Sequence, residues 1–133
     1  MILLDTTFLI DLLRKRENAI KKAVELSGKN RLATTYVNIY ELLLGVYSVE
    51  GIDYEKKLQD AERLLEKLEI LILEKQSAII SAKIGGALSL EGQMIGDVDN
   101  MIAGIALANN ISTIVTRDKE HFQRIKGIRV EGY

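Results

Sequence analysis

The chain opens with Ile2-Leu3-Leu4-Asp5-Thr6-Thr7-Phe8-Leu9-Ile10-Asp11-Leu12-Leu13. Its first three residues are apolar and predict a short buried strand, whereas the apolar residues from Phe8 onward recur at the spacing of one helix face. Threonine commonly caps a helix, so the helix is expected to begin near Thr6 and Thr7. The segment therefore predicts a strand over residues 2–4, a helix directly after it, and Asp5 at the carboxyl end of the strand.

The same alternation of strand and helix continues to the end of the chain. The predicted strands are residues 31–34, 70–73, 112–115 and 128–130, and the predicted helices are residues 15–26, 36–46, 53–68, 75–89, 97–107 (or 99–107) and 121–125. Strands that alternate with helices pair in parallel, which predicts a three-layer α/β domain with a central parallel sheet of four to five strands. The continuous apolar run at residues 70–73 is expected to be covered on both faces of that sheet.

Length and composition limit the class of protein. The 133 residues suffice for one core, and we expect a single domain over residues 1–133. The net charge of −1 excludes a protein that binds nucleic acid through overall positive charge. The absence of cysteine excludes disulfides and cysteine-bound zinc. No signal peptide and no run of about 18 apolar residues occurs, so we expect a cytoplasmic protein with no membrane contact.

Four acidic residues stand in otherwise apolar sequence: Asp5, Glu41, Asp99 and Asp118. Burying an ionised carboxylate is costly unless it is paired or bound to a metal, so four such residues suggest a shared cation. Ligands of parallel sheets bind beyond the carboxyl ends of the strands, which Asp5 and Asp118 can both reach. Oxygen-only ligands favour Mg²⁺ or Mn²⁺, since zinc normally recruits cysteine or histidine and the only histidine, His121, is expected on the surface. Clusters of acids that hold Mg²⁺ hydrolyse phosphodiester bonds with a metal-activated water.

Each acid also has a purely structural interpretation. Asp5 can cap the helix that follows it, and Asp118 can open a turn or cap the last helix. Glu41 can pair with a buried arginine instead of a metal. Asp97 and Asp99 are two residues apart and cannot share a helix face, so one can cap the helix while the other serves the site. The residues by themselves leave these alternatives open.

Four motifs, in order, resemble those of the PIN-domain nucleases, and most closely the VapC-like toxins of prokaryotic toxin–antitoxin pairs. The motifs are Ile-Leu-Leu-Asp5 with the helix after it, Thr35 to Glu41-Leu42 with Gly45, Gly96-Asp97-Val98-Asp99-Asn-Met-Ile-Ala, and Thr113-Ile-Val-Thr116-Arg-Asp118 followed by Phe122. Together they extend over nearly the whole chain. Two positions depart from the commonest pattern, because Thr7 stands where asparagine or serine is usual and Asn38 where threonine often lies.

The resemblance implies a PIN-like α/β/α domain whose metal-binding catalytic pocket is formed by Asp5, Glu41, Asp99 and Asp118. The supporting polar residues that it implies are Thr6, Thr116 and Asp97. It further implies dependence on Mg²⁺ or Mn²⁺, endonucleolytic cleavage of RNA, a homodimer and an inhibitory antitoxin partner. We therefore expect a metal-dependent ribonuclease that acts as the toxin of such a pair.

Two other functions are compatible with the sequence. A PIN-type nuclease of housekeeping RNA processing or decay would have the same site, and a neighbouring small reading frame whose product silences this chain would favour the toxin. A non-catalytic RNA-binding or interaction module would fail to bind Mn²⁺. The basic residues Arg14, Lys15, Arg16, Arg117 and Lys119 either guide a phosphate backbone toward the site or are solvated surface charges.

Overall fold

A central sheet of five short strands organises the protein, whose computed structural model describes all 133 residues. The strands are β1 (Ile2–Leu4), β2 (Leu32–Thr35), β3 (Glu69–Leu71), β4 (Thr113–Val115) and β5 (Arg129–Glu131). They lie in the order β3-β2-β1-β4-β5, and every neighbouring pair is parallel. The predicted parallel sheet of four to five strands is confirmed.

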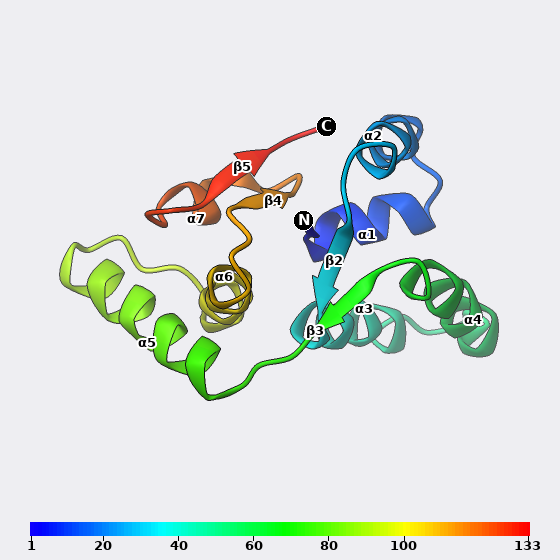
Figure 1. Cartoon of the computed structure of the whole chain (residues 1–133). Coiled ribbons are helices and arrows are strands. Elements are labelled where there is room, and N and C mark those ends of the chain that lie inside the picture. The colour runs from blue at the N-terminus through cyan, green and yellow to red at the C-terminus, as the bar shows by residue number, and fades with distance from the viewer.

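Seven helices surround this sheet. They are α1 (Thr6–Leu13), α2 (Glu17–Ser27), α3 (Tyr36–Tyr47), α4 (Tyr54–Leu65), α5 (Lys75–Leu90), α6 (Asp97–Ala108) and α7 (Lys119–Gln123). Helices α5 and α6 lie on one side of the sheet, and α1 and α2 lie on the other (Figure 1). None of the helices has the length and apolar character that a membrane crossing requires.

The two faces of the sheet carry separate cores because side chains alternate along a strand. Leu3 and Ile114 belong to the core that α5, α6 and α7 cover. Their strand neighbours Leu4 and Val115 belong to a second core, together with Phe8 of α1 and residues of α2. The result is the predicted three-layer α/β/α arrangement.

Strand β3 differs from the expectation that it is covered on both faces. It lies at the edge of the sheet, beyond β2, and it ends at Leu71. Ile72 and Leu73 therefore belong to the connection to α5, where they are 53% and 42% exposed. A continuous apolar run predicts a strand, but its burial depends on neighbours in space, and an edge strand has a neighbouring strand on one side only.

The strand order reverses between β1 and β4. From β1 the chain passes through β2 to β3 at one edge, and it then returns to β4 on the opposite side of β1. Asp5 follows β1 directly, and its backbone N–H donates to the carbonyl of Val115 in β4 (3.0 Å). Thr116 follows β4. In open parallel sheets the carboxyl ends of the strands at such a switch point form a crevice that binds ligands.

Candidate active site

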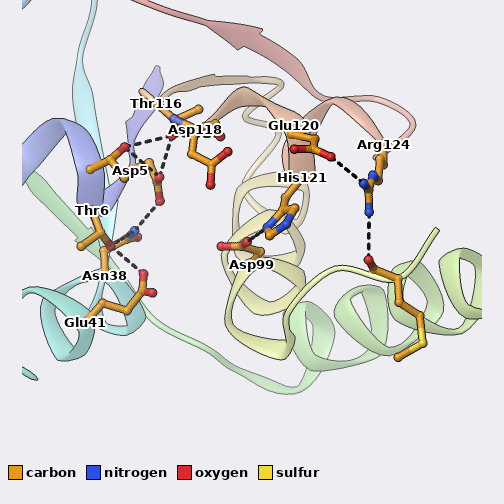
Figure 2. A network of polar contacts seen from close by, with 12 residues as sticks. Asp5, Thr6, Asn38, Glu41, Asp99, Thr116, Asp118, Glu120, His121 and Arg124 are labelled. Atoms are coloured by element: carbon orange, nitrogen blue, oxygen red, sulfur yellow. Dashed lines mark hydrogen bonds and ion pairs between the residues drawn. The ribbon is translucent and has the colours of Figure 1, made fainter.

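A cavity of about 340 Å³ opens at this switch point. Nine residues line it: Asp5, Thr6, Thr7, Ile10, Glu41, Asp99, Asp118, His121 and Phe122. The four acids singled out from the sequence are all among them. They come from four separate parts of the chain, namely the end of β1, helix α3, the first turn of α6 and the segment between β4 and α7. Figure 2 shows their side chains around the same space.

Asp5 is held by donors from three segments. The residue is 5% exposed. Its Oδ1 accepts a hydrogen bond from Asn38 Nδ2 (3.2 Å), and its Oδ2 accepts from the hydroxyls of Thr116 (2.8 Å) and Thr7 (3.3 Å). Asp5 occupies the N-cap position of α1, yet its side chain makes no capping hydrogen bond. The alternative of a simple helix cap therefore does not describe this residue.

The acids of the cavity are not neutralised by lysine or arginine. Burial raises the pKa of Asp5 from 3.8 to about 6; the negative charges of Asp99 and Glu41 add to the rise, and hydrogen bonds from Thr116 and from the Thr6 backbone oppose it. Burial, together with the charge of Asp99, also raises the pKa of Glu41, against the hydrogen bond that it receives from Thr6. No lysine or arginine lines the cavity.

Glu41 and Asp118 both keep carboxylate oxygens free. Glu41 Oε1 accepts a hydrogen bond from Thr6 Oγ1 (2.7 Å), while Oε2 has no partner within the protein. No arginine pairs with Glu41, so the alternative of a buried ion pair is not realised. Asp118 precedes α7 without a capping side-chain hydrogen bond. Its backbone N–H donates to Thr116 Oγ1 (3.1 Å), and its carboxylate faces the cavity.

The two acids of the third motif lie on different sides of α6. Asp99 Oδ2 is 2.7 Å from Nδ1 of His121, and both residues line the cavity. Asp97 instead lines a separate cavity of about 360 Å³ between α5 and α6. Two residues along a helix turn the side chain by about 200°, which explains the separation. Gly96 occupies the N-cap position, so Asp97 is not the helix cap, and Asp97 does not line the acidic cavity.

Three further polar residues of the site are not evident as site residues from the sequence. Asn38 and Thr7 contact Asp5, and His121 contacts Asp99. The available signal for Asn38 is a polar residue on an otherwise inward helix face, and the side chain is indeed fully buried. Asn38 and Thr7 are also the two positions at which the chain departs from the commonest motif pattern, and both lie next to Asp5.

Comparison with known proteins decides the family. A sequence profile of the PIN domain matches residues 2–128. The chain belongs to the PIN-domain family. The resemblance inferred from the four motifs is thereby confirmed, and the cavity just described lies entirely within the matched region of this PIN domain.

Within this family the chain is similar to the VapC proteins. It is 29% identical over 131 residues to the tRNA(fMet)-specific endonuclease VapC of Salmonella typhimurium, covering 98% of this chain and 96% of that protein. It is 30% identical over 132 residues to ribonuclease VapC1 of Methanocaldococcus jannaschii, covering 99% of this chain and 86% of that protein. The fold agrees as well. DNA-bound VapBC from Salmonella typhimurium matches with a TM-score of 0.85 at 28% identity, covering 98% of this chain and 96% of that chain.

The cavity of this PIN domain suits a divalent metal ion. Its carboxylates supply hard oxygen donors, and Asp5, Glu41 and Asp99 are near enough for the charge of one to raise the pKa of another. A cation would remove that repulsion. No three acidic or histidine side chains lie close enough together to form a preformed ion site. The donor set therefore suits an ion that binds one or two carboxylates directly and completes its shell with water.

Proposed function

We propose that this PIN-domain protein is a Mg²⁺- or Mn²⁺-dependent endoribonuclease and the toxin of a toxin–antitoxin pair. The observation that carries the proposal is the set of four carboxylates, Asp5, Glu41, Asp99 and Asp118, around one cavity without a lysine or arginine to neutralise them. The similar proteins described above as ribonuclease and tRNA-specific endonuclease support RNA as the substrate. Mg²⁺ and Mn²⁺ are proposed because both prefer oxygen ligands and pair readily with phosphate oxygens.

The residues of the cavity have distinct parts in this proposal. The bound ion would neutralise the phosphate and activate a water molecule for attack at phosphorus. Asp5, whose two carboxylate oxygens both accept hydrogen bonds, is a ligand with a fixed position. Glu41 has a free Oε2 and a raised pKa, so it can accept a proton from the attacking water. Without a cation these acids repel phosphate, so RNA is expected to bind there only when the ion is present.

Replacing one acid of α6 tests this function, because the same helix supplies a matched control. Wild-type protein is expected to cleave a mixed pool of tRNA and messenger RNA with Mg²⁺ or Mn²⁺ and to be inactive with EDTA. Asp99→Asn is expected to lower the cleavage rate by about 100-fold or more. Asp97→Asn makes the same change of charge outside the cavity and is expected to cleave at the wild-type rate. Undiminished cleavage by Asp99→Asn would refute the assigned chemistry.

A groove beside the cavity supports an inhibitory protein partner. It has a volume of about 250 Å³ between α1, α3 and the start of α4, and its lining is mainly apolar. Ile10 lines both the groove and the acidic cavity, so a polypeptide seated in the groove reaches the mouth of the site. We expect the product of a neighbouring reading frame to bind here and stop RNA cleavage. Val49→Glu, at the groove wall, is expected to weaken that inhibition without changing cleavage itself.

A homodimer is supported by one exposed face of α3. Tyr36, Tyr40, Leu44 and Tyr47 lie on this face and are 57%, 60%, 50% and 55% exposed. An exposed apolar stripe of this kind marks an interaction surface more often than a solvated one. Light scattering is expected to give twice the monomer mass of 14.9 kDa for wild type and the monomer mass for Tyr40→Glu. A monomeric wild type would contradict the proposed dimer.

A further inference from the structure

Asn38 stands in the middle of a hydrogen-bond chain that joins two acids of the cavity. Its side chain is fully buried. Oδ1 accepts from the backbone N–H (3.2 Å) and the hydroxyl (2.7 Å) of Thr35. Nδ2 donates to Asp5 Oδ1 (3.2 Å) and to Thr6 Oγ1 (3.0 Å), as Figure 2 shows. Every donor and acceptor of the amide is therefore in use.

The direction of each bond follows from groups that can only donate or only accept. The backbone N–H of Thr35 can only donate, so the amide oxygen of Asn38 faces Thr35 and its NH₂ group faces the cavity. Thr6 Oγ1 accepts one of the amide protons, which leaves its own proton for Glu41 Oε1 at 2.7 Å. The amide thus binds Asp5 directly and orients Glu41 through Thr6.

We infer that Asn38 is a positioning residue: it fixes the carboxylates of Asp5 and Glu41 relative to each other and thereby sets the affinity of the cavity for a divalent ion. The inference rests on the proposed function, since it takes the cavity to bind such an ion. Two neighbouring carboxylates repel each other and move apart unless donors hold them. Residues that hold metal ligands through hydrogen bonds typically contribute about 10- to 100-fold to metal affinity or activity.

Helix capping is the competing explanation for the burial of Asn38. Asn38 and Thr35 form a reciprocal capping box at the start of α3. Helix α5 begins with the same arrangement, in which the hydroxyl of Ser77 accepts from the backbone N–H of Glu74 (2.8 Å). Serine at this helix position is therefore sufficient for the cap. The substitution Asn38→Ser removes the NH₂ donors toward the cavity and retains a group that can cap α3.

Mn²⁺ binding to the full chain, measured by isothermal titration calorimetry, separates the two explanations. Asn38→Ser and Thr6→Val are each expected to weaken Mn²⁺ binding by about tenfold, and Thr6→Ser, which keeps the hydroxyl, is expected to bind as wild type does. Asn38 and Thr6 act on Glu41 in series, so the double variant Asn38→Ser/Thr6→Val is expected to lose less than the product of the two single effects. Ser77→Ala removes a cap from α5, which has no residue in the cavity, and should lower the melting temperature without changing Mn²⁺ affinity.

The outcomes distinguish this inference from the proposed function. A wild type that neither binds Mn²⁺ nor cleaves RNA overturns both. A wild type that does both, together with Asn38→Ser and Thr6→Val variants of unchanged Mn²⁺ affinity, overturns the inference alone and leaves Asn38 as a helix cap. Thr6→Val does not touch the capping box of α3, so it decides the question if Asn38→Ser fails to fold.

Discussion

The Nδ1 atom of His121 lies 2.7 Å from Oδ2 of Asp99, inside the cavity that the acids share. The sequence predicts surface placement for His121. Its side chain is 39% exposed, yet it faces α6 and contacts Asp99, which the sequence does not indicate. The short helix α7 buries Phe122 in the core and turns His121 toward the site. Polar neighbours along the chain could not reveal a partner that comes from another helix.

We predict that His121→Ala lowers kcat for RNA cleavage by about tenfold, whereas His121→Asn retains most of it. An ionised carboxylate only accepts hydrogen bonds, so Nδ1 donates to Asp99 and holds it toward the cavity. The amide nitrogen of asparagine can take nearly the position of Nδ1. Steady-state kinetics with kcat and KM measured separately check this. An equal loss in both variants would mean that the imidazole itself, and not its hydrogen bond, is required.

From the raised pKa of Asp5 we predict that the metal-free protein becomes less stable as the pH rises through about 6. The pKa of Asp5 is raised from 3.8 to about 6, so the folded protein binds this proton more tightly than the unfolded chain does. The resulting contribution to the free energy of unfolding is fully present below a pH of about 4 and is lost as the pH rises through 6, amounting to about 3 kcal/mol. Urea unfolding in EDTA across this range measures it.

The variant Asp5→Asn is the control for that experiment because asparagine does not titrate. Without metal we expect the variant to be more stable than wild type at neutral pH and to lose this advantage near a pH of about 4. Saturating Mn²⁺ is expected to stabilise wild type and not the variant, because a ligand stabilises only the state that binds it. Parallel pH profiles for the two proteins would show that Asp5 is not the titrating group.

Hydrophobic periodicity is sufficient to predict the helices and strands of this fold, because the spacing of apolar residues along one face is a local property of the sequence. The helix predicted over residues 75–89 is observed at Lys75–Leu90. The helix predicted over residues 53–68 is observed at Tyr54–Leu65, where Asp53 acts as the cap by accepting from the backbone N–H of Lys56. Its last turn is lost because the chain must turn there into β3. The residue at which a helix or strand ends therefore depends on capping and on the element that follows. Hydrophobic periodicity contains neither kind of information.

The four acids that line the cavity could be named from the sequence, since an acidic residue within an apolar segment indicates a site that compensates its charge. The residues by themselves do not determine whether Asp97 or Asp99 faces the cavity, because the rotation of α6 about its axis is set by packing against α5; the resemblance alone assigns Asp99 to the pocket. That packing turns Asp99 toward the cavity and Asp97 away from it. The donors around Asp5 are likewise a tertiary property, since Asn38 comes from the first turn of α3 and Thr116 from the end of β4.

An ion pair between buried Asp11 and half-exposed Arg117 joins α1 to the segment after β4, and the two residues are expected to respond differently to mutation. Asp11 is 4% exposed, and both of its carboxylate oxygens accept from Arg117 Nη1 (2.9 and 3.1 Å). Arg117 is therefore not a free guide for a phosphate backbone. We expect Arg117→Met to lower the free energy of unfolding by about 3 kcal/mol, because it leaves a buried carboxylate unpaired. Urea unfolding measures the loss.

Replacing Asp11 instead of Arg117 is expected to lower the free energy of unfolding by less. Asp11→Asn keeps an acceptor for the hydroxyl of Tyr133, and the Arg117 side chain, which is 56% exposed, can be hydrated once it is released. The double variant should then be no less stable than Arg117→Met alone, since the unpaired charge is removed. A larger loss for Asp11→Asn than for Arg117→Met would contradict this account of the pair.

Gly104 allows α6 to pack directly against α5, and we predict that Gly104→Ala lowers the free energy of unfolding by about 3 kcal/mol. A Cβ atom there would meet the side chain of Ser81 and lie 2.7 Å from the carbonyl oxygen of Ser77, which is backbone and can yield only if the helices separate. Gly86, on the exposed side of α5, has nothing within 4 Å of such an atom. Gly86→Ala is therefore expected to raise the free energy of unfolding by roughly 0.5–1 kcal/mol through its helix propensity. Because α6 carries Asp99, Gly104→Ala should also weaken Mn²⁺ binding, whereas Gly86→Ala should leave it unchanged. Equal urea midpoints for the two variants would show that the close approach of the helices does not limit residue size at Gly104.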